Sequence, residues 1–258
     1  MKKNLKHLQK LNKKNAILLA VAAFALSTSS AFAQICTLNT NWTGGSGSWF
    51  TSTNWDHGVP NSNTAASINN AGTAQIPSVL SANACSLTLG NDISNSGAVS
   101  VGGSLTVADS VVVANKGTGT LTITTGGTVA SGSASIAVQT GQVWTSNGTV
   151  TVNSGSSWAI NGNLSLGAGT ATMAFGVTPT SAGSVTAQGT ATLNSNKHLV
   201  ITFSGGNYTP NAQYTLLTAN GGRTGTFSVS YINIPPNLCP VIQYDANHVK
   251  LVLPTCTL

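Results

Sequence analysis

The chain has 258 residues, of which ten are Lys or Arg, four are Asp and none is Glu, and 41% are hydrophobic. Six of the ten basic residues lie among the first fourteen positions. From residue 34 onward four basic and four acidic side chains balance to a formal net charge of zero. This balance argues against a nucleic acid as partner, because binding to phosphates needs a basic surface. Little electrostatic repulsion separates copies of such a chain, so we expect self-association.

The N-terminal segment has the pattern of a secretory signal. Basic residues between Lys2 and Lys14 precede an apolar run, 16–26, and the small-x-small sequence Ala31-Phe32-Ala33 follows. The apolar run is too short to span a bilayer. We therefore predict a signal peptide over 1–33 and a secreted protein that is extracellular or at the cell surface, with a periplasmic location left open. We find no second apolar stretch long enough for a transmembrane anchor, and we therefore predict none.

The segment 34–85 is aromatic and rich in turn residues, and we predict an N-terminal cap there. Its tryptophans, Trp42, Trp49 and Trp55, allow two interpretations. The indole rings can cover the open end of a stack of strands, where they shield apolar residues from water. Alternatively, they can form a flat glycan-stacking site.

Between 86 and 203 short alternating triplets recur, separated by Gly, Asn or Ser. Alternation with period two places both apolar side chains of a triplet on one face of a strand. Gly recurs too often for helices. The triplets begin at residues Val99, Leu105, Val111, Leu121, Ile136, Val150, Trp158, Leu164 and Met173.

These strands are shorter and closer together than those of a sandwich, which favours the three-faced turns of a β-helix. The sequence 119–129 also returns in imperfect form as 148–158. A single turn cannot bury its own apolar side chains, so stacked turns share a core. The fold prediction is all-β: a single right-handed parallel β-helix with about five to seven turns, at roughly twenty or more residues each.

Longer strands are predicted from 204 to 258, and we interpret this segment as a C-terminal cap. The sequence Asp245-Ala246-Asn247 is a turn signal between strands 241–244 and 249–253. These two strands should form a β-hairpin that covers the end of the β-helix, because open strand edges need a cover or a partner.

Four cysteines, an even number in an exported chain, indicate two disulfides with three possible connectivities. We favour Cys36–Cys85 and Cys239–Cys256, which would staple the two ends and add roughly 3–4 kcal/mol each in the chain-entropy description. None of the four belongs to a C-x-x-C pair, so we predict no metal site and no cofactor.

Three passages resemble bacterial autotransporter passengers. They are 42–49 with 54–60 (Trp-Thr-Gly-Gly-Ser-Gly-Ser-Trp, then Asn-Trp-Asp-His-Gly-Val-Pro), 117–123 with 126–129, and 214–219 with 221–227. The resemblance implies a parallel β-helix exposed outside the cell, commonly in adhesion or surface layers, and favours the cap interpretation of the tryptophans. Passengers usually continue into a membrane β-barrel, whereas we expect no such translocator in this chain.

Catalysis on such a fold needs convergent charge, such as paired carboxylates. The four acids, Asp56, Asp92, Asp109 and Asp245, are far apart in sequence, although Asp92 and Asp109 could stack on neighbouring turns. The histidines His57, His198 and His248 open strands or lie in turns, and no G-x-S-x-G nucleophile elbow occurs. We predict no catalytic residues and a protein that is not an enzyme.

Paired threonines recur with one residue between them, and rows of them in register could order water as in an ice-binding β-helix. Thr is also favoured on any pleated surface. The pairs are Thr118/Thr120, Thr122/Thr124, Thr149/Thr151, Thr170/Thr172 and Thr190/Thr192.

The leading hypothesis is a secreted scaffold or adhesin that binds copies of itself or glycans of a host or cell surface. The alternative is a glycan-binding or polysaccharide-degrading β-helix. An ice-binding protein and a filament subunit are less favoured.

Overall fold

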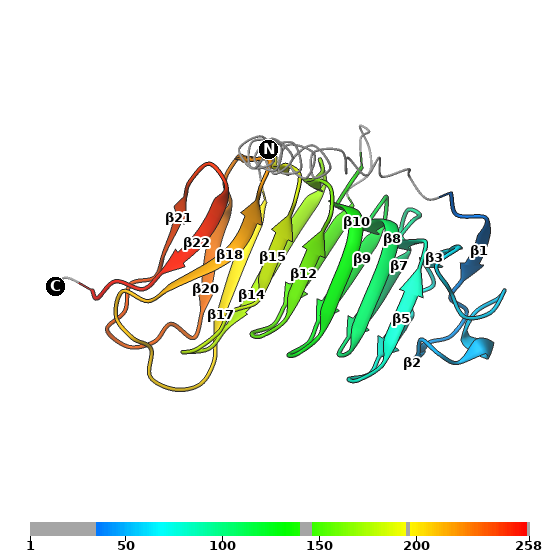
Figure 1. Cartoon of the computed structure of the whole chain (residues 1–258), viewed down its shortest axis with the longest axis horizontal. Coiled ribbons are helices and arrows are strands. Elements are labelled where there is room, and N and C mark those ends of the chain that lie inside the picture. The colour runs from blue at the N-terminus through cyan, green and yellow to red at the C-terminus, as the bar shows by residue number, and fades with distance from the viewer. Residues whose placement is uncertain (1–34, 140–145, 195–196, 257–258) are drawn as a thin grey trace, which may run out of the picture. The chain divides into compact units, whose positions relative to one another are not determined.

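The computed structural model describes residues 35–139, 146–194 and 197–256, so the predicted signal peptide lies outside the described residues. Within these ranges the elements are β-strands and one 3₁₀ turn, η1 (Ser52–Asn54). The strands stack side by side into a parallel β-helix of about seven turns (Figure 1). The predicted fold, an all-β parallel β-helix, is confirmed.

Each full turn of the chain crosses the three sides of the β-helix, which we call face 1, face 2 and face 3 in chain order. Two long strands, β8 (Ser104–Val113) and β10 (Thr128–Ile136), bend from face 3 into the next face 1. The other strands of face 1 are β1 (Leu38–Asn41), β3 (Thr64–Ile68), β6 (Ser86–Leu89), β13 (Leu164–Leu166), β16 (Ala191–Leu193) and β19 (Arg223–Thr224).

Face 2 is a separate eight-stranded parallel sheet. Its strands are β2 (Ser46–Ser48), β4 (Thr73–Ile76), β7 (Ser96–Val101), β9 (Thr118–Ile123), β11 (Asn147–Val152), β14 (Thr170–Val177), β17 (His198–Phe203) and β20 (Ser228–Ile232). Face 3 holds, besides the first halves of β8 and β10, the strands β5 (Ser81–Ala84), β12 (Ser157–Ile160), β15 (Ser184–Ala187) and β18 (Gln213–Ala219).

The core lies inside the three faces, where alternate side chains of each strand stack on the same positions of the next turn. Leu121 pairs with Val150, and Val150 with Met173, and all three side chains are fully buried. The imperfect repeat seen in the sequence becomes a physical register, since Gly119 pairs with Gly148. Burial of an apolar column along the axis is therefore the main stabilising interaction of the fold.

A stacked corner joins face 1 to face 2. Gly90, Ala114 and Ala137 occupy it on successive turns, with φ of 62°, 66° and 53°. The left-handed conformation at Ala137 ends β10 at Ile136. The predicted triplet beginning at Ile136 is therefore wrong, and the buried pair in this strand is Ala134 and Ile136.

In β7, β9 and β11 the inner residue near the start of the strand is a glycine that packs against that corner, whereas β14 has Ala171 at the equivalent position. A Cβ on Gly119 would lie 2.3 Å from the backbone nitrogen of Ala114, and one on Gly97 would lie 1.8 Å from a backbone oxygen. Since no side chain fits at such distances, glycine is required there. The recurrent glycine that excluded helices in the sequence thus marks this close approach.

Parallel pairing extends on both sides of the predicted range 86–203. It begins with β1 on β3, and it continues through β18 on β15 and β20 on β17. The cap segments thus supply strands to the β-helix as well as covers. Beyond β18 the pairing becomes antiparallel, with β22 (His248–Val252) on β18 and β21 (Val241–Tyr244) on β22, which confirms the predicted hairpin.

Candidate functional site

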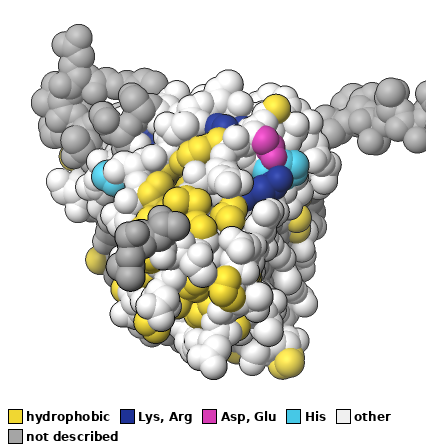
Figure 2. Space-filling view, turned by 90° about the vertical axis from the view of Figure 1, so that its left-hand side faces the viewer, with side chains coloured by type: hydrophobic (Ala, Val, Ile, Leu, Met, Phe, Trp, Pro, Cys, Tyr) yellow, Lys and Arg dark blue, Asp and Glu magenta, His cyan; other side chains and the backbone are white. Residues whose placement is uncertain are grey.

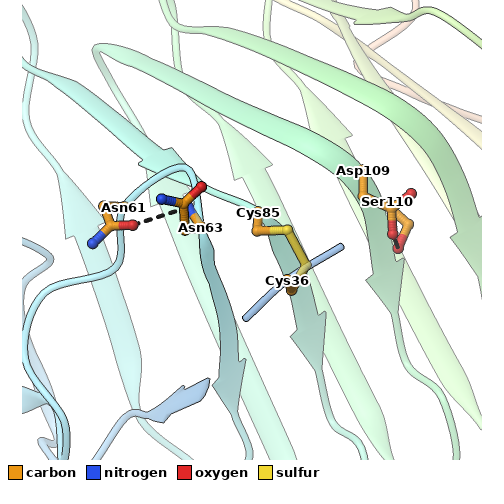
Figure 3. Close-up of a disulfide and its surroundings, with 6 residues drawn as sticks. All are labelled: Cys36, Asn61, Asn63, Cys85, Asp109 and Ser110. Carbon is orange, nitrogen blue, oxygen red and sulfur yellow. Dashed lines mark hydrogen bonds between the residues drawn. A yellow bond between two sulfur atoms is a disulfide. The ribbon is translucent and has the colours of Figure 1, made fainter. Parts of the chain in front are cut away.

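Two disulfides tie the ends of the chain to the β-helix, with the connectivity predicted from the sequence. Cys36, just before β1, bonds Cys85 at the corner between faces 3 and 1, and Cys239 bonds Cys256 across the C-terminal hairpin. Figure 3 shows Cys36 reaching Cys85 beside the backbone of Asp109, whose N–H donates to the Cys85 carbonyl at 2.7 Å. The bridges fit an oxidising compartment.

The three N-terminal tryptophans form one buried cluster. Trp42, Trp49 and Trp55 are 2%, 0% and 4% exposed. The ring of Trp55 meets the other two edge-on, with centroids 5.0 Å from Trp42 and 4.9 Å from Trp49. The cluster covers the apolar end of the first turn. The burial of its ring faces favours the cap interpretation over glycan stacking.

A short return of the chain closes the free edge of β1. Trp55 forms an antiparallel bridge with Trp42, and Asp56 accepts hydrogen bonds from the backbone and side-chain nitrogens of Asn41 at 2.7 and 2.8 Å. Burial raises the pKa of Asp56, but these bonds and the neighbouring His57 outweigh it and hold the pKa well below its usual range. The carboxylate therefore stays charged and works as a structural acceptor.

The acidic residues are not brought together. Asp92 lies in the corner between β6 and β7, where it accepts a bond from Asn69 at 2.6 Å. Asp109 lies at a different corner, beside Cys85, so Asp92 and Asp109 do not stack. Asp56 and Asp245 lie at opposite ends of the β-helix. Among the described residues no group of three or more His, Cys, Asp or Glu could hold a metal ion.

The histidines also occupy separate places. His57 contacts Asp56 at 2.8 Å in the N-terminal cap, and His248 contacts Asp245 at 2.8 Å in the C-terminal hairpin. His198 points outward from β17 on face 2, in register with Thr172. Each histidine thus serves a turn or a face position, as the sequence predicted, and no two of them converge within the described ranges.

Several large apolar side chains are exposed at the C-terminal end. Figure 2 looks onto this end and shows hydrophobic side chains gathered across its middle, with an acidic, a histidine and a basic side chain at the rim. Ile232, Ile234 and Val241 are 46%, 49% and 41% exposed. A hollow of about 390 Å³ lies beside β17, bordered by Phe203, Tyr208, Asn233, Ile234 and Pro235.

Charged side chains lie at the rim of this end and bind neighbouring groups there. Hydrogen bonds from the Asn247 backbone N–H at 2.9 Å and from Lys250 at 3.0 Å keep the pKa of Asp245 well below its usual range. The guanidinium of Arg223 lies 4.6 Å from the ring centre of Tyr244, a cation–π contact. Tyr244 in turn accepts a hydrogen bond from the Phe227 N–H at 3.1 Å.

One buried charged group is not predicted by the sequence pattern. Lys197, just before β17, is 1% exposed and donates to the carbonyl of Gly169, and burial lowers the pKa of its ammonium. A lone lysine before a strand gives no sequence signal of burial, because long basic side chains usually extend into solvent.

Small hydroxyl side chains form columns on all three outer faces. On face 3 one column consists of four serines and one threonine from successive turns. On face 2 threonines from β9, β11 and β14 lie side by side. The face 3 column is Ser81, Ser104, Thr128, Ser157 and Ser184. Four of the five predicted threonine pairs belong to face 2 or the corner after it, whereas Thr192 lies on face 1 opposite Ser165.

Within the described part of the chain no helix is long and apolar enough to cross a membrane. No protein-family model matches this sequence, and no curated protein matches it either.

Proposed function

We propose that the mature chain acts outside the cytoplasm as a scaffold or adhesin, with contacts made by the outer faces of the β-helix. The observation that supports this most is that all three outer faces carry columns of small, neutral side chains with hydroxyl groups, aligned from one turn to the next. Such faces offer many weak, repeated contacts over a long surface. Contacts of this kind suit adhesion to an extended partner better than capture of a single small molecule.

The stapled ends support the same proposal. A disulfide at each end restrains the terminal strands, which are the first part of a stacked fold to open. A rod that keeps its shape in an oxidising, protease-rich environment is what a surface scaffold requires. The resemblance to autotransporter passengers points in the same direction.

The test is retention of the oxidised, secreted chain on glycan arrays, on isolated cell envelopes and on polysaccharide particles, with analysis of any soluble products. We expect retention without release of oligosaccharides, and the same retention for Asp→Asn variants at residues 56, 92, 109 and 245. Released oligosaccharides that disappear in one of these variants would contradict the proposal and favour a polysaccharide-degrading enzyme. Retention nowhere would reject an adhesin.

Self-association is tested separately by electron microscopy at rising protein concentration. End-to-end particles would identify a filament subunit, the exposed apolar C-terminal end being the expected contact. Single rods at every concentration would leave contacts through the faces as the mode of action.

A further inference from the structure

The outer surface of face 2 carries a two-dimensional array of threonines. In one column Thr120 pairs with Thr149 and Thr149 with Thr172, and in the next Thr122 pairs with Thr151. Small residues extend both columns, with Ala98 and Ser100 on the preceding strand, β7, and Ala174 on β14. We call this surface, formed by β7, β9, β11 and β14, the threonine array.

The array has regular spacing in both directions. Neighbouring strands of a sheet lie about 4.8 Å apart, and alternate residues along one strand lie about 6.7 Å apart. The parallel register runs without a bulge from β7 to β14, so these two distances repeat across the array. Oxygen atoms on flat faces of hexagonal ice repeat at comparable distances in two perpendicular directions.

The hydroxyl groups of the array are not used inside the protein. Threonines elsewhere bond to protein groups, as buried Thr40 of β1 does with the Gly58 carbonyl and Thr124, just after β9, with the Val101 carbonyl. Among the described residues, by contrast, no side-chain hydrogen bond involves Thr120, Thr149 or Thr172, nor their neighbours Thr122 and Thr151. These hydroxyls are free to hold water, and the methyl groups beside them restrict where that water can lie.

The array is also held rigidly. The residues between its threonines point inward, and Leu121, Ile123, Val150 and Val152 are fully buried in the core. The patch contains no charged side chain within the described residues; larger outward residues border it, among them Gln75 on β4, Asn147 on β11, and His198 and Val200 on β17. A rigid, neutral, regularly spaced surface can fix an ordered layer of water without first ordering its own side chains.

From these observations we infer that the threonine array binds ice, through a layer of water held in an ice-like arrangement by its hydroxyl and methyl groups. This function is independent of adhesion through the other faces. It requires only that the strands of face 2 keep their parallel register and that the threonine hydroxyls of the array make no hydrogen bonds within the protein.

The test is thermal hysteresis and ice shaping by the oxidised, secreted chain, measured in a nanolitre osmometer. The diagnostic variant is Thr149→Tyr, which places a bulky ring in the middle of the first column. Its control is Thr186→Tyr, an outward threonine of the same partial exposure on β15 of face 3. We expect hysteresis and faceted ice crystals from the original chain and the control, and loss of both from Thr149→Tyr at an unchanged melting temperature.

A second readout keeps the inference testable if Thr149→Tyr folds poorly, because Thr149→Val retains the shape and removes one hydroxyl. Hysteresis for this variant should fall below that of the original chain. Freely growing, unshaped ice in the presence of the original chain would overturn the inference. Equal hysteresis in Thr149→Tyr and Thr186→Tyr would remove the assignment to face 2. Binding to crystalline cellulose but not to ice, lost in Thr149→Tyr, would replace ice by a polysaccharide as the ligand.

Discussion

The two ends of the β-helix solve the same problem in different ways. At the N-terminal end one local segment, 42–56, folds back over the first turn and buries three indole rings above the core. At the C-terminal end two strands leave the parallel order and form an antiparallel hairpin on β18, while Ile232, Ile234 and Val241 stay exposed. The first end is closed by aromatic burial and the second by extra backbone pairing.

The difference concerns stability and not exposure alone, since Ile35 and Leu38 at the N-terminal end are 82% and 56% exposed. Buried aromatic rings contribute much more free energy than exposed hairpin residues. We therefore expect the N-terminal cap to stabilise the fold as a unit and the C-terminal end to be the weaker, more adaptable one. Four sets of variants can break or sharpen this comparison.

The largest effect is expected for Trp49→Ala. Its side chain is fully buried against Trp55, and truncation of a core Trp costs about 3–5 kcal/mol of unfolding free energy. Denaturant unfolding followed by circular dichroism measures the loss. The matched change at the other end, Ile234→Ala, removes a half-exposed side chain and should change stability by less than about 1 kcal/mol. Similar losses at both ends would refute the proposed asymmetry.

Removal of each disulfide comes next. The Cys36–Cys85 bridge closes 49 residues and Cys239–Cys256 closes 17, so the chain-entropy description gives contributions of about 4 and about 3 kcal/mol. The double variants Cys36→Ser/Cys85→Ser and Cys239→Ser/Cys256→Ser should both lower the melting temperature, the first by more. Reductant should destabilise the original chain and leave a variant without either bridge unchanged. A larger loss for the C-terminal pair would contradict the description of that end as the weaker one.

A smaller effect on stability is expected from the hydrogen bonding of the indole N–H groups in the cap, which differs between Trp49 and Trp55. The Trp55 nitrogen donates to the Trp49 carbonyl at 2.8 Å, whereas the buried Trp49 nitrogen has no partner among the described residues. Trp→Phe removes similar volume at either position, so the difference isolates one hydrogen bond. We expect Trp55→Phe to cost roughly 1–2 kcal/mol more than Trp49→Phe in unfolding free energy. Equal costs would show that this bond adds nothing.

The smallest effect concerns the acids of the two ends. The folded pKa of Asp56 lies below its ordinary value of 3.8, so its contribution is present above that pH and is lost as the pH falls below it. Asp56→Asn should lower stability by about 1 kcal/mol at pH 7, since the group is partly exposed. The gap to the original chain should narrow at pH 3. Asp245→Asn, at a carboxylate that is more exposed than that of Asp56, should change the melting temperature less.

Much of this architecture follows from local pattern. The apolar-x-apolar triplets at Leu121 and Val150 predict which side chains face inward, because period two assigns the face of a strand without knowledge of its neighbours. The turn signal at Asp245 predicts the hairpin, and four cysteines in a chain with a predicted signal peptide predict its bridge. These inferences succeed because each depends on a few adjacent residues or on one covalent constraint.

Other features depend on how many residues each corner takes. The triplet expected at Ile136 shifts because Ala137 adopts the left-handed corner conformation, and the Thr192 pair falls on face 1 instead of face 2. The repeat of 119–129 as 148–158 aligns Thr120 with Thr149, but the pairing of Thr149 with Thr172 depends on the length of the next turn, which that repeat does not give.

The sequence by itself determined that the strands are short and alternating, which side chains face inward, where the hairpin lies and that two disulfides form. All of these depend on a few adjacent residues or on one covalent constraint. Only the tertiary structure decided that the tryptophans are buried, that Lys197 lies in the core and that the threonines of β9, β11 and β14 form one array. The physical reason is that burial and register are properties of stacked turns, fixed by contacts between residues more than twenty positions apart.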